Sequence, residues 1–264
     1  MQNASKAPPR REGVQAIARA SAVLRALEPH PEGLGLLQLA GAVGLPKSTV
    51  HRLVGALAQE DLLTTKPGGR IALGGGLTRL GAAGSLALQD ELRPLMARLR
   101  EELGETVDLA VLDQGQMRFV EQLTAAHRLQ AVSAVGARFP LHCTANGKAL
   151  LAALSRERAL ALLPARLPRA TEHTIVSRAA LLEELEQIRA RGVAFDREEH
   201  TVGISAVGAA VLGPLGPLAA ISVPVPTARF RGSEQRYAAA VRDTAREAAA
   251  LLGAAEAQPR LSAS

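Results

Sequence analysis

Residues 36–57 read LLQLAGAVGLPKSTVHRLVGAL, a stretch that predicts two short helices joined by a tight turn. Apolar residues of the first part recur at the spacing of one helix face: Leu36, Leu39, Ala40 and Val43. Gly44 can adopt the backbone conformation of a sharp turn, and Pro46 is well tolerated in a first helical turn. A second apolar face follows at the same period: Val50, Leu53, Val54 and Leu57. The sequence therefore predicts a helix-turn-helix.

The opposite side of the second predicted helix is polar. It carries hydroxyl, imidazole and guanidinium donors: Ser48, Thr49, His51 and Arg52. Gly55 on the same side leaves room for a close approach. An exposed helix with these donors suits the major groove of DNA, where base edges are read by hydrogen bonds. An ordinary helical hairpin with a solvated polar face is the alternative that these residues alone leave open.

The segments around this motif favour DNA binding. An amphipathic helix is predicted over residues 14–28, and two short strands, 62–66 and 70–74, flank a Pro-Gly-Gly turn. Three helices followed by a hairpin is the order of a winged helix-turn-helix. Residues 1–76 carry nine Lys and Arg against five Asp and Glu, whereas the remaining chain carries twenty-two against twenty. We expect three cations to contact phosphate groups: Lys47, Lys66 and Arg70.

Composition narrows the class of protein. The 264 residues suffice for one or two domains, and 47% hydrophobic residues can build a sizeable core. The chain has no apolar run of the ~18 residues that a membrane span needs. Residues 1–13 are basic without the apolar centre of a signal peptide, so we expect a flexible arm and a cytoplasmic protein. The single cysteine excludes an internal disulfide and a cysteine-based zinc site, and we expect no cofactor or metal.

The chain beyond Gly74-Gly75-Gly76 predicts a second domain. We expect a linker helix over residues 75–90, either continuous or broken near residues 81–84, a larger second domain over 91–254 and a flexible tail over 255–264. Strands are predicted at residues 107–113, 117–123, 129–133, 193–195, 204–212 and 218–225. Helices are predicted at residues 147–154, 156–163, 179–191 and, capped by Ser233, up to 252. Adjacent strands with short turns indicate an α+β domain with a largely antiparallel sheet.

The loop over residues 136–148, GARFPLHCTANGK, precedes a predicted helix. Backbone N–H groups near Ala145, Asn146 and Gly147 would point into the space before that helix, where they attract carboxylates or phosphates. Thr144 is the expected cap, and a capped helix start without a ligand is the alternative. The spacing matches neither a Walker loop nor GxGxxG, so it indicates no nucleotide.

A second group of polar residues could carry chemistry. Asp196 follows an apolar strand and is expected to face a cavity, whereas Glu198 and Glu199 are expected in a solvated loop. Ser222 lies inside an apolar strand and needs a partner. A small hydrolase or isomerase using Asp196, His200 and Cys143 is the enzymatic alternative. We reject it because neither a nucleophile–base–orienter set nor a metal-ligand set is evident.

Four motifs in this order resemble the IclR family of bacterial transcription regulators. They are VQAI at 14–17 with Arg19-Ala20, GLPKSTVHRL at 44–53, LHCTANGKA at 141–149 and FDREE at 195–199 before Gly203. The resemblance covers nearly the whole chain. It implies a winged helix-turn-helix head, a linker helix and a C-terminal effector domain similar to GAF sensors. It also implies dimers, often paired into tetramers, on palindromic operators, with small organic acids or aromatic-pathway metabolites as effectors.

The resemblance also implies an effector pocket. Ala145 and Asn146, after Thr144, would offer backbone N–H groups to a carboxylate, and Asp196 and Ser222 would supply polar side chains. The wall would be apolar: Phe139, Leu141 and Ile204. Ala206 and Pro224 stand where other members can present polar groups, which favours a more apolar pocket here. The predicted function is a ligand-responsive DNA-binding regulator. A DNA-binding protein whose second domain only oligomerises is the alternative.

Overall fold

The computed structural model describes residues 10–113, 115–131 and 133–253. Most of the predicted arm and all of the predicted tail lie outside these residues, but Arg10 to Gly13 belong to a helix. Contacts divide the chain into two compact units that meet between Leu86 and Ala87. Among the described residues, no helix is long and apolar enough to cross a membrane.

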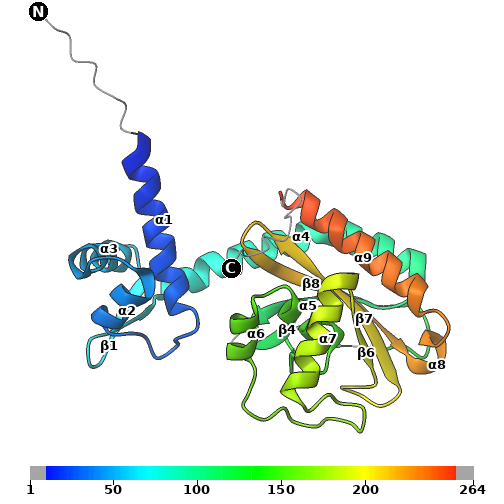
Figure 1. Ribbon diagram of the computed structural model, residues 1–264. Coiled ribbons are helices and arrows are strands. Elements are labelled where there is room, and N and C mark those ends of the chain that lie inside the picture. The colour runs from blue at the N-terminus through cyan, green and yellow to red at the C-terminus, as the bar shows by residue number, and fades with distance from the viewer. Residues whose placement is uncertain (1–9, 114, 132, 254–264) are drawn as a thin grey trace, which may run out of the picture. The chain divides into compact units, whose positions relative to one another are not determined.

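The first unit has the predicted order of three helices and a hairpin (Figure 1). Its elements are α1 (Arg10–Leu27), α2 (Leu36–Val43), α3 (Lys47–Gln59), β1 (Leu63–Lys66) and β2 (Arg70–Leu73). Helix α1 begins four residues before the predicted start at Val14. Gly44 ends α2 in the left-handed region with φ of 65°, and its N–H group donates to Ala40 and Gly41.

The core of the first unit joins all five elements. Apolar side chains from each of them are buried together: Val23, Leu27, Leu39, Val50, Leu57, Leu63 and Ile71. Strands β1 and β2 pair antiparallel, and Leu34 adds an isolated bridge to Ile71 through two backbone hydrogen bonds of 2.8 and 2.9 Å. The predicted winged helix-turn-helix is therefore confirmed. Its apolar faces meet in one core and leave the polar side of α3 outside.

Helix α4 (Gly75–Leu103) crosses from one unit into the other as a single helix of 29 residues. It runs without interruption through Gly81 and Gly84, so of the two predicted possibilities the structure shows a continuous helix and not one broken near residues 81–84. In the second unit its apolar face is buried from Leu92 to Leu103.

The second unit is built on one curled six-stranded sheet with the strand order β5-β4-β3-β8-β7-β6. The strands are β3 (Val107–Asp113), β4 (Gln116–Leu123), β5 (Arg138–Phe139), β6 (Ala194–Arg197), β7 (Ile204–Gly213) and β8 (Gly216–Pro226). Every pairing is antiparallel, which confirms the predicted α+β class with an antiparallel sheet. Asp108, Ser222 and Gly208 are register partners across the middle strands.

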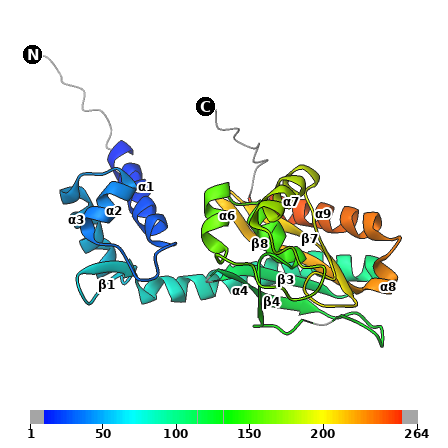
Figure 2. The same cartoon turned by 60° about the horizontal axis from the view of Figure 1, so that its bottom comes forward.

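Helices cover both faces of this sheet (Figure 2). The second half of α4 and α9 (Glu234–Leu251) pack on one face around residues such as Leu109, Val207 and Ile221. The other face carries α5 (Ala145–Ala152), α6 (Arg156–Leu162) and α7 (Arg178–Arg191). A short helix α8 (Thr227–Phe230) follows β8.

Four local predictions were wrong. The described residues of 129–133 form a loop rather than a strand, because their side chains cover a cavity instead of pairing at a sheet edge. Helix α5 begins at Ala145, two residues before the predicted start, because Thr144 caps it directly. Ser233 precedes α9, but its side chain makes no capping hydrogen bond. Strand β6 also runs past Phe195, so Asp196 lies within a strand.

Candidate DNA-contacting helix and ligand cavity

Helix α3 presents the predicted polar side to solvent. Ser48, His51 and Arg52 are exposed, and Thr49 is half-buried. Among the described residues, none of these four side chains has a hydrogen-bond or ion-pair partner. Lys47 is exposed at the first turn. The opposite side, with Val50 and Leu57, is fixed in the core, so the free donors are carried by a rigidly placed helix.

The two cations of the wing, Lys66 and Arg70, both donate hydrogen bonds to backbone carbonyl oxygens of the first unit. The Lys66 ammonium donates to the Pro31 carbonyl oxygen at 2.8 Å. The Arg70 guanidinium donates to the carbonyl oxygens of Glu32 and Gly33 at 3.0 and 2.6 Å. These contacts fasten the wing to the loop before α2. Sequence reasoning placed both residues near DNA but gave no indication of this structural role.

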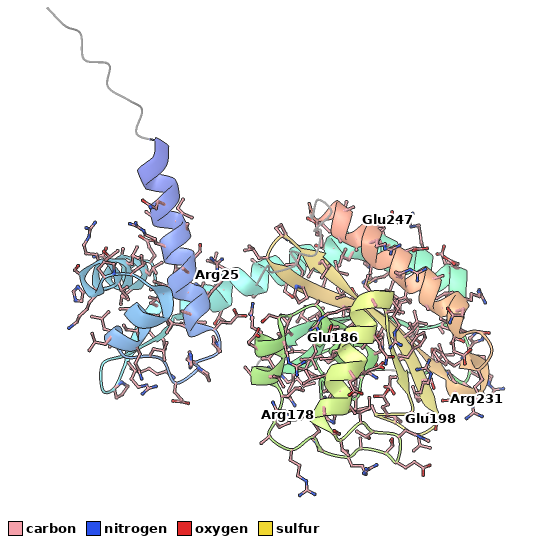
Figure 3. The ribbon with its side chains drawn as sticks, in the orientation of Figure 1. Arg25, Arg178, Glu186, Glu198, Arg231 and Glu247 are labelled. Carbon is pink, nitrogen blue, oxygen red and sulfur yellow. The ribbon has the colours of Figure 1, made fainter. Side chains whose placement is uncertain are left out.

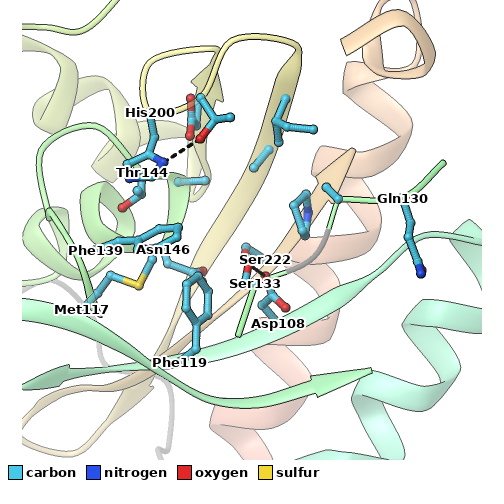
Figure 4. A pocket seen from close by; sticks show the side chains of 17 residues that line it. Asp108, Met117, Phe119, Gln130, Ser133, Phe139, Thr144, Asn146, His200 and Ser222 are labelled. Carbon is cyan, nitrogen blue, oxygen red and sulfur yellow. Dashed lines mark hydrogen bonds between the residues drawn. The ribbon is translucent and has the colours of Figure 1, made fainter. Parts of the chain in front are cut away.

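A cavity of about 230 Å³ lies in the second unit where α5 meets the sheet (Figure 4). It is smaller than the roughly 300–1,000 Å³ of pockets for drug-sized ligands, so it suits a small molecule. Residues from every strand of the sheet, the start of α5 and two loops line it: Asp108, Met117, Phe119, Gln130, Ala131, Ser133, Phe139, Thr144, Ala145, Asn146, Asp196, His200, Thr201, Ile204, Ala206, Ser222 and Pro224.

The N-terminus of α5 opens into this cavity. Thr144 caps the helix: its Oγ1 accepts from the Gly147 N–H at 3.2 Å and donates to the Pro140 carbonyl oxygen at 2.9 Å. The N–H groups of Ala145 and Asn146 have no acceptor within the described part of the chain. Two free donors and the positive end of a helix make this edge of the cavity suitable for an anion.

Two buried carboxyl groups stand elsewhere in the wall. Asp108 accepts hydrogen bonds from Gln122 and Ser133, both at 2.7 Å, yet burial raises its pKa to about 6. Asp196 accepts from the Glu199 N–H at 2.7 Å, and burial with the nearby Glu199 charge raises its pKa to about 7. Removal of a carboxylate from water disfavours its charged form, which explains both directions.

A buried ion pair lies behind the start of α5. Lys148, 1% exposed, donates to Glu199 Oε1 at 2.5 Å and lies 3.8 Å from Glu184. The expectation that Glu199 is solvated was wrong, because Lys148 brings it into the interior. Glu198 is nearer the surface: it accepts from the Gly203 N–H at 2.9 Å and lies 3.9 Å from Arg231 (Figure 3).

Aromatic rings form one side of the cavity. Phe139 stacks on His200 with ring centroids 4.2 Å apart, and Phe119 meets Phe139 edge to face at 5.2 Å. Burial lowers the pKa of His200, so this imidazole is neutral at pH 7, and it pairs with Thr201 Oγ1 at 2.8 Å. The wall therefore offers flat apolar surfaces.

The structure brings together seven of the eight residues predicted for the effector pocket. Leu141 is the exception: it is buried in the core between α5 and the sheet and does not line the cavity. Sequence reasoning missed several lining residues: Asp108, Met117, Phe119, Gln130, Ser133 and Thr201. Asp108 was detectable as a charged residue inside an apolar strand, whereas Gln130 and Ser133 were hidden in a mispredicted strand.

This geometry does not support the alternative of a hydrolase or isomerase that uses Asp196, His200 and Cys143. Cys143 is fully buried, and burial raises the pKa of its thiol to about 12. Asp196 and His200 line the cavity, but Cys143 does not. Within the described ranges, no cluster of three His, Cys, Asp or Glu residues could hold a metal ion.

A winged helix-turn-helix unit joined to a unit with a small-molecule cavity defines a ligand-binding transcription regulator. Residues 16–67 match the IclR helix-turn-helix domain, and residues 81–250 match the C-terminal domain of bacterial IclR transcriptional regulators. This chain belongs to the IclR family.

Similarity to individual relatives supports the same family. The HTH-type transcriptional regulator Rv1719 of Mycobacterium tuberculosis is 48% identical over 230 residues, covering 87% of this chain and 89% of its own. The transcriptional repressor IclR of Escherichia coli is 34% identical, with 82% of each chain covered. A crystal structure of an IclR homologue from Microbacterium hydrocarbonoxydans, complexed with 4-hydroxybenzoate, shares the fold with a TM-score of 0.59 and 24% identity. That match covers 91% of this chain and all of the homologue.

Proposed function

We propose that this regulator binds a palindromic operator as a homodimer or homotetramer in the cytoplasm, and that a small organic acid or aromatic-pathway metabolite controls this binding. In this assignment residues 14–74 bind DNA, 75–90 form the linker and 91–254 bind the effector. The observation that carries the effector class is the open N-terminus of α5. Its first two N–H groups, which have no acceptor in the part of the chain that the structure describes, give the cavity one place for a carboxylate.

Helix α3 supplies the operator contacts in this proposal. Ser48, Thr49, His51 and Arg52 read base edges in the major groove, since their side chains are free and their helix is fixed. Lys47 contacts phosphate at the start of the helix. Lys66 and Arg70 act from the wing, where their structural contacts compete with a direct phosphate contact. Their electrostatic attraction for the duplex does not depend on that contact.

The effector must bind the DNA-competent and DNA-incompetent states with different affinity, because only a differential affinity shifts their populations. The carboxylate lies on Ala145 and Asn146, and Asp196, Thr144 and Ser222 provide further polar contacts. Phe139 and Ile204 hold the apolar part. Leu141 supports this wall from the core behind it.

Capture of fragmented source genome by the purified protein tests this proposal, with pooled organic acids in a parallel sample. We expect a few enriched sites that contain an inverted repeat, and altered retention in the presence of the acids. Uniform retention of all fragments would contradict operator binding. Enrichment that no acid alters, together with an unchanged melting temperature, would favour the alternative in which the second unit only oligomerises.

A further inference from the structure

The side-chain amide of Asn146 has no hydrogen-bond partner among the residues that the structure describes. It is 2% exposed, and neither its Oδ1 nor its Nδ2 has a hydrogen-bond partner within the described part of the chain. The residue lines the cavity, and Figure 4 shows it among Phe139, Met117 and Phe119. A buried amide of this kind is uncommon, because nearly all buried polar side chains are paired.

No structural role accounts for this amide. Thr144, and not Asn146, caps α5 through its side chain. The backbone N–H of Asn146 serves the helix end whatever its side chain is. An unpaired amide in an apolar wall destabilises the free protein, so its presence indicates a partner that arrives with the ligand.

The required partner must both donate and accept. A primary amide has an oxygen that needs a donor and an NH₂ group that needs an acceptor. Gln130 Oε1, also in the cavity wall, is a second buried acceptor without a partner in the described ranges of the chain. A carboxylate alone leaves both acceptors unpaired because it has no hydrogen to donate.

The charge of the wall disfavours a second anionic group. Among the described residues that line the cavity, the charged side chains are the two carboxyl groups of Asp108 and Asp196, and no Lys or Arg joins them. A second anion away from the α5 end would meet like charge in a poorly solvated space. A neutral hydroxyl or carboxamide carries both a donor and an acceptor without this penalty.

We propose that Asn146 is a specificity-determining residue, and that the ligand carries a hydroxyl or carboxamide group that pairs with its side-chain amide. This inference deepens the proposed function: the carboxylate lies on the backbone at the start of α5, and the neutral group lies on the side chain of the same turn. The rings of Phe119, Phe139 and His200 favour a flat scaffold between the two groups.

Calorimetric titration of the full chain with matched ligand pairs tests this inference. The acid pairs are 3-hydroxybenzoate with 3-methylbenzoate and 4-hydroxybenzoate with 4-methylbenzoate, since methyl and hydroxyl groups have similar size. The neutral pair is 4-hydroxybenzyl alcohol with 4-methylbenzyl alcohol. In at least one pair we expect the hydroxyl compound to bind at least about 10-fold more tightly, since a site built to pair a hydroxyl rejects its apolar analogue.

Variants assign this preference to Asn146. In Asn146→Leu the preference should fall below about threefold while the methyl compound still binds, because the apolar side chain no longer needs a partner. Asn146→Ser, which keeps a donor and an acceptor, should retain part of the preference. Thr201→Val is the matched control: it changes another polar lining residue and should leave the preference intact.

The outcomes separate this inference from the proposed function. Equal binding within every pair of the wild-type protein, or a preference that survives in Asn146→Leu, overturns the role of Asn146. Binding of the neutral pair alone, with an Asn146-dependent preference, supports the inference and contradicts the carboxylate assignment. Binding of no compound in either set overturns the inference, whereas operator capture still tests DNA binding separately.

Discussion

Replacement of Lys148 by Met should strongly destabilise the second unit. Lys148 is 1% exposed, and it is the hydrogen-bond donor that the structure provides to the Glu199 carboxylate. Glu199 Oε2 already lacks a partner within the described residues, so the substitution leaves a buried and uncompensated charge. Loss of one member of a buried ion pair costs about 3–5 kcal/mol. The loss of Lys148 costs less at Glu184, because Arg191 still donates a hydrogen bond to that carboxylate at 2.5 Å.

Urea unfolding followed by tyrosine fluorescence measures this loss. The chain has no tryptophan and a single tyrosine, Tyr237, which is buried in α9 of the second unit. The signal therefore reports on that unit without a contribution from the DNA-binding unit. For a urea dependence of about 2 kcal/mol per molar, the expected loss lowers the unfolding midpoint by roughly 2 M.

Two further variants test the reasoning behind that number. Glu199→Gln should cost less than Lys148→Met, because Lys148 keeps Glu184 at 3.8 Å as a second anion. The double variant should be more stable than Lys148→Met alone, since it removes the uncompensated charge. A midpoint shift below about 0.5 M for Lys148→Met, or a double variant less stable than both single variants, would refute the charge argument.

Three further predictions concern the DNA helix, the cavity and α5. Arg52→Ala should weaken operator binding by about 1–3 kcal/mol, measured by fluorescence anisotropy at fixed salt. The control is Arg25→Ala, which changes an exposed arginine of α1 (Figure 3) and should leave the affinity unchanged. Equal affinities of wild type and Arg52→Ala would show that Arg52 does not read a base. The pKa of Asp196 is raised from 3.8 to about 7, so the folded protein holds this proton more tightly than the unfolded chain does. The free energy of unfolding should therefore fall as pH rises from about 4 to 7, by up to about 4 kcal/mol. Asp196→Asn should flatten this decline in urea unfolding at several pH values, and an unchanged slope would contradict it. Gly147→Ala should cost about 1–3 kcal/mol in the same assay, because its Cβ would lie 2.4 Å from the Leu141 carbonyl oxygen; a neutral effect would show that α5 can shift.

The DNA-binding unit was predictable because its information is local. Helical spacing, a turn glycine and the Pro-Gly-Gly hairpin each act over a few residues, and each agrees with the same fold. The two wing cations show the limit of local reading. Their charge suggested a phosphate contact, but nothing in the sequence near Lys66 indicates the carbonyl oxygen of Pro31, which lies 35 residues earlier.

The effector cavity was predictable only in part, because its wall combines distant segments. Thr144, Ala145 and Asn146 were identified from the start of one helix, and Asp196 from a strand end. The partner of Glu199 could not be found, since Lys148 is 51 residues away and reads as a surface cation. Residues 129–133 were predicted to form a strand, and only the tertiary structure shows that Gln130 and Ser133 cover a cavity.

The free cavity contains polar groups that are not fully satisfied. Within residues 10–113, 115–131 and 133–253, the Asn146 amide has no partner and two N–H groups at the start of α5 have no acceptor, and Asp196 has a raised pKa. Each of these destabilises the unliganded unit, and a ligand with a carboxylate and a neutral hydroxyl or amide relieves at least the first two. Binding therefore stabilises the second unit according to ligand concentration over Kd. Because the same groups that weaken the free unit select the ligand, a variant that makes the empty cavity more stable, such as Asn146→Leu, should also make it less selective.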